Sequence, residues 1–226
     1  RQCSYERSSR FRSSRSAFGG SDHPPDRPRM RVVFVAALPP ERSSVIGRIL
    51  QLGAAVQAAN HSVEVLSLSG NDRPPFARTT ERLGVRVRLV GPSLRATSTK
   101  TPSVHDTWYR YRAGRNALTQ ALRNTRADVI ILTKPQLQNA PPVLAYARRN
   151  GVPLILDADD LEGAASRFPP VVRWYAERLE KASARAAEIV TACSPFLVHY
   201  FQEQSPKTRV EFLPTGIDIP TVPPSR

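Results

Sequence analysis

The chain has 226 residues, of which 40% are hydrophobic, and its 33 Lys and Arg against 19 Asp and Glu give a formal net charge of +14. This apolar content is enough for a sizeable core, so a folded globular domain is expected. No stretch approaches the roughly 18 to 20 consecutive apolar residues of a membrane helix, so any membrane contact of this sequence is expected to be peripheral.

The strong positive charge raises the question of nucleic-acid binding. Arg supplies nearly all of it, as an Arg-biased genome would, and no basic face with interleaved aromatic residues forms a known nucleic-acid module. Arg110, Arg112 and Arg115 beside Trp108 come closest. No nucleic-acid partner is therefore expected, while a basic surface remains compatible with anionic lipid headgroups or a phosphorylated substrate.

Cysteine and histidine give no sign of a metal or a disulfide. Cys3 and Cys193 lie in very different surroundings, the first in a polar leader and the second in an apolar segment, so no structural disulfide is expected and a reducing compartment fits. The four histidines have no short spacing to one another, so no zinc site is predicted.

Residues 1–29 are rich in Arg, Ser, Gly and Pro and lack apolar periodicity, which predicts a disordered leader. Met30 directly precedes the first apolar run and is a candidate start of translation. A transit peptide is an alternative for an Arg- and Ser-rich leader, but its acids Glu6, Asp22 and Asp26 argue against it.

From residue 31 onward, predicted strands alternate with helices. Residues 31–38 form a continuous apolar run rich in β-branched residues, typical of a parallel strand covered on both faces. An amphipathic helix follows from 44, a second strand over 62–68 and a third, with an edge-like alternation, over 84–90. The later elements are a helix over 104–124, a strand over 128–133, a helix from Asn139 to 149, a strand over 152–157, a helix over 171–186, a strand over 188–193, a short helix from Ser194 and a strand over 209–214.

This alternation predicts an α/β fold with a doubly wound parallel sheet of about seven strands in the order 3-2-1-4-5-6-7. Ligands of such folds bind beyond the carboxyl ends of the strands, near the point where the strand order reverses. Three loops then form the predicted site: 39–44 after the first strand, 134–139 after the fourth, and 157–162 after the fifth.

The first of these loops, LPPERSS, contains no G-x-G-x-x-G, which disfavours a nicotinamide or flavin enzyme. Ser43, Ser44 and Gly47 stand at a helix N-terminus that can offer backbone N–H groups to a hydroxyl or a phosphate, although capping of the helix alone explains either serine. Ser194 is explained by capping as well, and the absence of a G-x-S-x-G motif argues against a hydrolase triad.

The most informative stretch is LILDADDLEG, in which an apolar strand runs into Asp157, Asp159, Asp160 and Glu162. Adjacent carboxylates disfavour mutual ionisation, so they require compensation. Asp159, at the centre, is the first candidate for substrate contact, by holding a sugar hydroxyl or acting as a base, with Asp160 and Glu162 beside it. A magnesium site is conceivable, but runs of acids more often form solvated turns, and no metal is predicted. Lys134, after the fourth strand, either binds an anion or is simply solvated.

Four stretches together resemble the N-terminal, acceptor-side Rossmann-like domain of GT-B glycosyltransferases, in particular the family 4 type. They are MRVVFVAALPP with the following IGRILQLGAAVQAANHSVEVLSL, DVIILTKPQLQNAPPVLAYARRNGVPLILDADDLEG, AEIVTACSPFLVHYF, and VEFLPTGID, which resembles a linker usually written near P-N-G-V-D. Two features depart from the family pattern. The Gly-Gly pair common in the first loop is missing, and Asp159 stands where many relatives have a histidine that touches the donor sugar.

The resemblance implies a retaining, metal-independent enzyme in which this domain, residues 30–214, binds the acceptor. A second domain binds the nucleotide sugar. The first loop, with Ser43, Ser44 and Gly47, would lie near the acceptor and the donor diphosphate. Residues 215–226, with Thr215 and Gly216, would form the interdomain linker. The donor domain is absent from this sequence, so the chain is expected to be inactive alone, as a fragment or as half of a split enzyme.

The expected function is transfer of a sugar from a UDP- or GDP-sugar to a lipid-linked or polysaccharide acceptor in cell-envelope synthesis. No cofactor is expected besides the nucleotide-sugar substrate. The donor domain, in cis or as a separate chain, is the expected partner, and the expected location is cytoplasmic, with peripheral contact at the inner face of the membrane. The alternative is a non-catalytic basic module that binds an anionic ligand, nucleic acid or a membrane surface.

Overall fold

The computed structural model describes residues 28–38, 44–71, 73–94, 103–165 and 169–215. The strands are β1 (Arg31–Val35), β2 (Ser62–Ser69), β3 (Arg78–Arg82), β4 (Val85–Pro92), β5 (Val129–Thr133), β6 (Leu154–Ala158), β7 (Ile189–Ala192) and β8 (Arg209–Phe212). The helices are α1 (Ser44–Ala58), α2 (Val104–Arg123), α3 (Ala140–Asn150), α4 (Glu162–Ala165), α5 (Pro170–Ala186) and α6 (Pro195–Gln204).

The strands form one sheet in the order β3-β4-β2-β1-β5-β6-β7-β8. All neighbouring strands pair in parallel except β3 and β4. The order reverses between β1 and β5, which pair from Val32 with Val129 to Val35 with Leu132. The doubly wound parallel sheet predicted from the sequence is thus confirmed, with its switch point between the first strand and the strand after α2.

The sheet has one strand more than predicted, and the seven predicted strands stand in the predicted order. We expected residues 84–90 to form an edge strand, but β3 pairs antiparallel with β4 and takes the edge. The sequence of β3, RTTER, contains no apolar residue, and most of the strand is exposed, so no hydrophobic pattern marks it. A tight turn at Leu83 and Gly84 joins the two strands, and both residues have positive φ (51° and 74°), as the favoured two-residue hairpin turns require.

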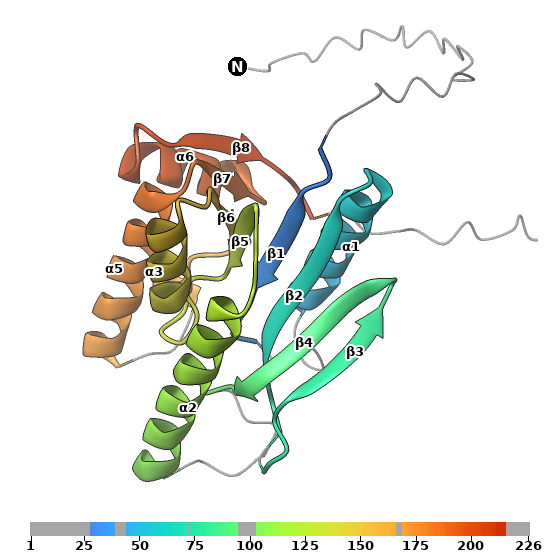
Figure 1. The fold of residues 1–226 in the computed structure, drawn as a ribbon. Helices are drawn as coiled ribbons and strands as arrows, with labels where there is room; N and C mark the ends of the chain where they lie inside the picture. Colours follow the sequence, from blue (N-terminus) through green and yellow to red (C-terminus); the bar gives the residue numbers. More distant parts are fainter. Residues whose placement is uncertain (1–27, 39–43, 72, 95–102, 166–168, 216–226) are drawn as a thin grey trace, which may run out of the picture.

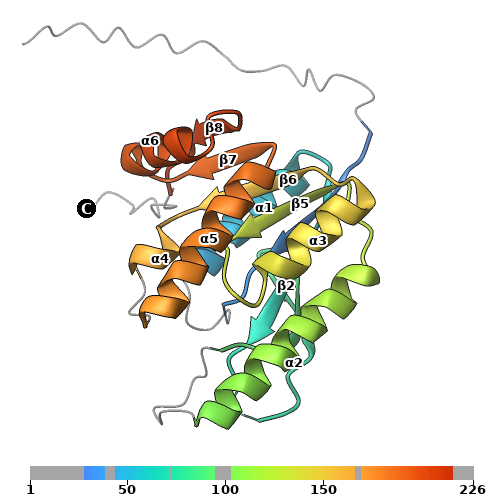
Figure 2. The same cartoon turned by 90° about the vertical axis from the view of Figure 1, so that its left-hand side faces the viewer.

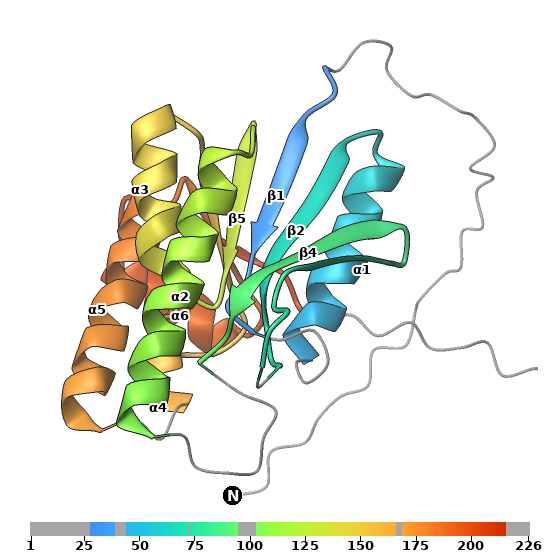
Figure 3. The same cartoon turned by 60° about the horizontal axis from the view of Figure 1, so that its bottom comes forward.

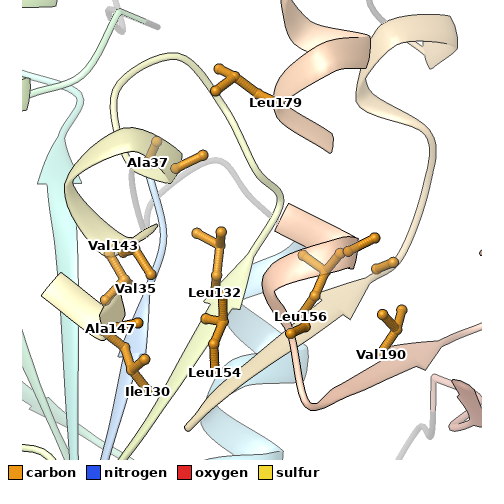
Figure 4. Close-up of a cluster of buried hydrophobic side chains, with 14 of the residues drawn as sticks. Val35, Ala37, Ile130, Leu132, Val143, Ala147, Leu154, Leu156, Leu179 and Val190 are labelled. Atoms are coloured by element: carbon orange, nitrogen blue, oxygen red, sulfur yellow. The ribbon is translucent and has the colours of Figure 1, made fainter. Parts of the chain in front are cut away.

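Helices cover the sheet on both faces (Figure 1). On one face, Val45, Ile46 and Ile49 of α1 pack against apolar side chains of β1, β2 and β4. On the other face, α2, α3 and α5 cover a second, larger cluster. Figure 4 shows part of this cluster, with Leu132 and Leu156 of the central strands and Val143 of α3 among its members. Burial on both faces explains why the central strands β1 and β5 are almost entirely apolar.

Local signals in the sequence place most helix ends correctly. Ser194 accepts a hydrogen bond from the Leu197 amide (3.3 Å) and caps α6, as predicted. Gly151 adopts φ 60° at the end of α3, a left-handed conformation that favours glycine. The predicted leader and linker lie almost wholly in residues 1–27 and 216–226, outside the described part, so the predicted domain boundaries remain predictions.

Candidate functional site

The carboxyl ends of the parallel strands all lie at the same end of the sheet. At this end α2, α3 and α5 begin, and α4 lies beside them (Figure 2). Lys134 follows β5 at this end, and Asp159, Asp160 and Glu162 follow β6, which pairs with β5. This places the predicted lysine and the predicted acids on adjacent loops. The structure brings their side chains into direct contact.

The Lys134 ammonium is surrounded by three carboxylates. Its Nζ lies 2.5 Å from Asp160 Oδ2, 3.4 Å from Glu162 Oε1 and 3.5 Å from Asp159 Oδ1. The lysine side chain is only 13% exposed, so it is largely removed from solvent. A ligand that contacts its ammonium would have to displace one of the three carboxylates. Burial acts to lower the pKa of Lys134, but the hydrogen bond to Asp160 and the charges of Asp159 and Glu162 raise it above its ordinary value.

An unusual backbone conformation directs Lys134 toward these acids. Its φ is 50°, in a region that residues other than glycine rarely occupy. The Asn139 amide Nδ2 donates to the carbonyls of Thr133 (3.2 Å) and Lys134 (3.0 Å). Asn139 Oδ1 accepts from the Gln136 amide (2.7 Å). Asn139 occupies the N-cap position of α3, but its side chain makes no capping hydrogen bond and instead stabilises the turn between β5 and α3.

The acids outnumber the single cation that compensates them. Burial raises the pKa of Asp159, and the charges of Asp160 and Asp157 add to this effect while Lys134 opposes it. Burial likewise raises the pKa of Glu162, against the opposing effect of Lys134 and of the Gln136 amide, which donates to Glu162 Oε2 (2.8 Å). The Oδ1 atoms of Asp159 and Asp160 are buried and accept no hydrogen bond from the described part of the chain, although Asp159 Oδ1 lies within ion-pair distance of Lys134 Nζ (3.5 Å). The Asp159 and Asp160 side chains are 17% and 38% exposed, so each carboxylate can still accept from a ligand donor such as a hydroxyl.

Asp157, the first acid of the segment, has a different partner. Arg48 of α1 donates to it through Nη2 (2.8 Å) and Nε (3.1 Å), and the two side chains are 4% and 1% exposed. Thr191 of β7 donates a further hydrogen bond to Asp157 (2.8 Å). The guanidinium also reaches the Leu213 carbonyl (2.9 Å) and the Thr215 hydroxyl (3.3 Å). Asp157 therefore belongs to a buried ion pair that joins α1 to the segment after β8.

Glu180 of α5 is a second buried acid, and it contacts the backbone at the start of α4. Its Oε2 accepts from the backbone amide of Glu162 (2.8 Å) at the start of α4, and the residue is 2% exposed. Burial raises the pKa of Glu180 to about 7, against the opposing effect of the Glu162 amide. Burial and the charge of Glu180 raise the pKa of the nearby Tyr200 to about 12. Glu180 thereby fixes the position of the backbone that carries Glu162.

Sequence reasoning missed Arg48 and Glu180, although each left a signal. Arg48 stands within the apolar stripe of α1, between Val45 and Ile49, and Glu180 follows Leu179 on the buried face of α5. A charged residue at a core-facing helical position requires a buried partner of opposite charge or hydrogen-bonding character.

The other predicted site residues are placed as follows. Gly47 is exposed in α1, with open space where a Cβ would lie, and Thr215 meets Arg48. Ser44 begins α1, but its side chain lies outside the described part, as do Ser43 and Gly216. In the described ranges no group of three or more His, Cys, Asp or Glu side chains is arranged to hold a metal ion. No helix among the described residues is long and apolar enough to cross a membrane.

Comparison with protein families decides the classification. Residues 45–216, most of the chain, match the model of the glycosyl transferase 4-like domain. The chain belongs to this family. The matched region of this glycosyltransferase domain includes Arg48, Lys134 and the acid segment 157–162. The resemblance inferred from the sequence is confirmed. A search of curated proteins finds no match for the chain.

Solved structures share the fold at low identity. A sucrose-phosphate synthase structure from Thermosynechococcus elongatus matches with a TM-score of 0.55 and 12% identity, covering 83% of this chain and 90% of that one. The catalytic domain of starch synthase IV from Arabidopsis thaliana, bound to ADP and acarbose, matches with 0.55 and 15%, covering 84% and 52%. Arabidopsis thaliana UGT89C1, complexed with UDP-L-rhamnose, matches with 0.53 and 13%, covering 86% and 54%. The glycosyltransferase domain thus spans about half the length of the last two chains.

Proposed function

We propose that this domain is the acceptor-side half of a retaining GT-B enzyme that transfers a sugar from a UDP- or GDP-sugar to a lipid-linked or polysaccharide acceptor in cell-envelope synthesis. A donor domain, in cis or as a separate chain, completes the active site. The observation that carries the proposal is the cluster around Lys134, which holds the carboxylates of Asp159 and Asp160 together beyond the carboxyl ends of β5 and β6. Family membership and the fold support it.

Asp159 is the catalytic candidate of this cluster. A carboxylate accepts a hydrogen bond from an acceptor hydroxyl, and a raised pKa brings its basicity closer to that needed at neutral pH. In the transfer, the acceptor oxygen bonds to the anomeric carbon, the bond from that carbon to the donor diphosphate breaks, and the hydroxyl proton passes to the carboxylate. Most of the rate enhancement comes from positioning the hydroxyl and stabilising the leaving diphosphate.

Lys134 has a supporting role in this proposal. With three carboxylates around its ammonium, it holds Asp159, Asp160 and Glu162 close together despite their mutual repulsion. The acids, and not the lysine, then meet the ligand. The proposed reaction is metal-independent, and the protein itself stabilises the leaving group. Peripheral contact with the inner face of the membrane, within the cytoplasm, is part of the proposal because a lipid-linked acceptor resides there.

The test is transfer by the domain joined to its donor partner, assayed with UDP- and GDP-sugars. Asp159→Asn should lower kcat/KM at least tenfold, about 1.4 kcal/mol of barrier, because it removes a proton acceptor while keeping the shape. Asp106→Asn is the matched control, since the Asp106 side chain lies 61% exposed in the first turn of α2. Equal rates for wild type and Asp159→Asn would remove Asp159 from the reaction, and failure of every nucleotide sugar to react would overturn the proposed function.

A further inference from the structure

A groove runs between α2 and α3, which lie side by side on one face of the sheet (Figure 3). Its volume is about 970 Å³, in the range of small-molecule sites. Four of its lining residues are arginines: Arg115 and Arg123 of α2, Arg126 of the following loop, and Arg149 of α3. No Asp or Glu is among the described residues that line it.

The four arginines have no acidic partner among the described residues. Arg115 donates to the Tyr111 hydroxyl (3.0 Å), and within the described part of the chain none of the four forms an ion pair. Asp128 lies two residues after Arg126, but its carboxylate accepts from the Arg31 amide (2.7 Å) and does not line the groove. Four like charges around one hollow repel one another, and a bound anion would relieve that repulsion.

Helix ends explain only half of this arrangement. Arg123 and Arg149 stand in the last turns of α2 and α3, where a cation stabilises the partial negative charge of the free carbonyls. Arg115 lies in the middle of α2, and Arg126 lies beyond its end, so neither has this role. Their convergence with the other two on the same groove requires another reason.

The rest of the lining indicates what kind of anion fits. Leu122, Ala145 and Val152 supply apolar surface. The Tyr146 hydroxyl is already used, since it donates to the Thr125 carbonyl (3.0 Å) and accepts from the Ala127 amide (3.2 Å). The free polar groups of the groove are therefore mainly guanidinium groups, whose paired N–H donors match phosphate oxygens. We propose that this groove binds a phosphorylated ligand with an apolar portion, its phosphates held by Arg115, Arg123, Arg126 and Arg149.

This groove is separate from the acid cluster. α3 begins next to the Lys134 turn, and Arg149 lies near its other end, about 15 Å away along a helix that rises 1.5 Å per residue. The cluster around Lys134 is acidic and the groove is basic, so one ligand group does not suit both. The proposal stands whether or not the domain transfers a sugar.

The test uses inorganic tripolyphosphate, titrated into the whole chain by isothermal calorimetry at low and moderate salt. The double variant Arg126→Gln with Arg149→Gln should bind it at least tenfold more weakly than wild type. The control variant, Arg173→Gln with Arg185→Gln on α5, changes the net charge equally at two other exposed arginines and should bind within twofold of wild type. Far-UV circular dichroism confirms that both variants remain folded.

Two results would overturn the proposal: no binding by the wild-type chain, or equal weakening by the two double variants, which would assign binding to net charge alone. A second titration distinguishes the sources of the phosphate. Retention on phosphatidylglycerol vesicles that depends on Arg126 and Arg149 would assign the groove to lipid headgroups. Tripolyphosphate binding without such retention would assign it to a soluble phosphorylated ligand.

Discussion

Lys134 organises the candidate site at the level of single residues. One buried ammonium compensates three carboxylates, so the group as a whole keeps a formal negative charge. Burial, together with the charges of the neighbouring acids, raises the pKa of Asp159 and Glu162. The positive φ of Lys134 is part of the same arrangement, because backbone strain of this kind persists where the surroundings hold it.

Glu180 gives the site a pH dependence that can be measured. Its pKa of about 7 in the folded protein lies above the ordinary value of 4.5, so the folded state binds more protons than the unfolded state between these two pH values. The stability that Glu180 contributes is therefore fully present below pH 4.5 and is lost as the pH rises to about 7. The loss is on the order of 3 kcal/mol.

Glu180→Gln should remove this loss, because a neutral amide oxygen still accepts from the Glu162 amide but does not ionise. Urea unfolding at pH 5 and pH 8 is expected to show a smaller decrease in the free energy of unfolding for Glu180→Gln than for wild type. Glu188→Gln is the control, because Glu188 is an exposed acid just after α5. This variant should show the same decrease in the free energy of unfolding as wild type. Parallel pH profiles for wild type and Glu180→Gln would contradict the assignment.

The sequence predicted the convergence of Lys134 with the acids because parallel strands end at one edge and these residues directly follow two strand runs. It did not predict which acid pairs with which cation. The spacing along the chain says nothing about Arg48 and Asp157, which are separated by 109 residues and meet only once α1 packs against the sheet. Contacts of this kind depend on tertiary packing and lie beyond local patterns.

Among the elements, α2 and β4 approach each other unusually closely. A Cβ on Gly114 of α2 would lie 2.3 Å from the Pro92 carbonyl oxygen and from Gln138 Nε2, and a Cβ on Gly91 would lie 2.6 Å from Ala117. Gln138 uses this closeness to donate to the carbonyls of Pro92 (3.1 Å) and Arg110 (3.0 Å). Small residues at the crossing therefore set the distance between the helix and the sheet.

Gly114→Ala should lower the free energy of unfolding by about 1–3 kcal/mol, because the added methyl meets backbone that cannot move without displacing β4. Gly47→Ala in α1 is the matched control. It adds a methyl where no atom lies within 4 Å, and it should raise stability by up to about 1 kcal/mol through helix propensity. Chemical unfolding of both variants checks the pair, and a neutral or stabilising Gly114→Ala would show that the helix shifts freely.

Element prediction succeeded where hydrophobic periodicity was strong and failed where it was absent. The buried strands β1, β5 and β6 read as apolar runs and β2 as an alternating strand, and their positions were correct. The polar edge strand β3 has no such pattern, because it buries little and depends on backbone pairing with β4. The four-residue helix α4 was likewise not predicted as an element, since it has too few residues to show a period.

At the scale of the whole molecule, the Arg48–Asp157 pair joins parts of the fold that are distant in the sequence. Arg48 belongs to the first helix, Asp157 to β6, Thr191 to β7, and Leu213 and Thr215 to the segment after the last strand. The pair lies between α1 on one side of the sheet and the region where the family linker is expected. Through Arg48, the pair therefore positions the segment after β8 against α1 and the sheet.

Removing one partner should be costly, because the other charge stays buried without compensation. Arg48→Met and Asp157→Asn are each expected to lower the free energy of unfolding by about 3–5 kcal/mol. The double variant should lose clearly less than the sum of the two, since each single change already breaks the same interaction. For comparison, Arg86→Met removes an exposed partner of Glu64, 3.8 Å away, and should cost less than about 1 kcal/mol. Urea unfolding of the four proteins measures the cycle, and strict additivity of Arg48→Met and Asp157→Asn would show that the two side chains act independently.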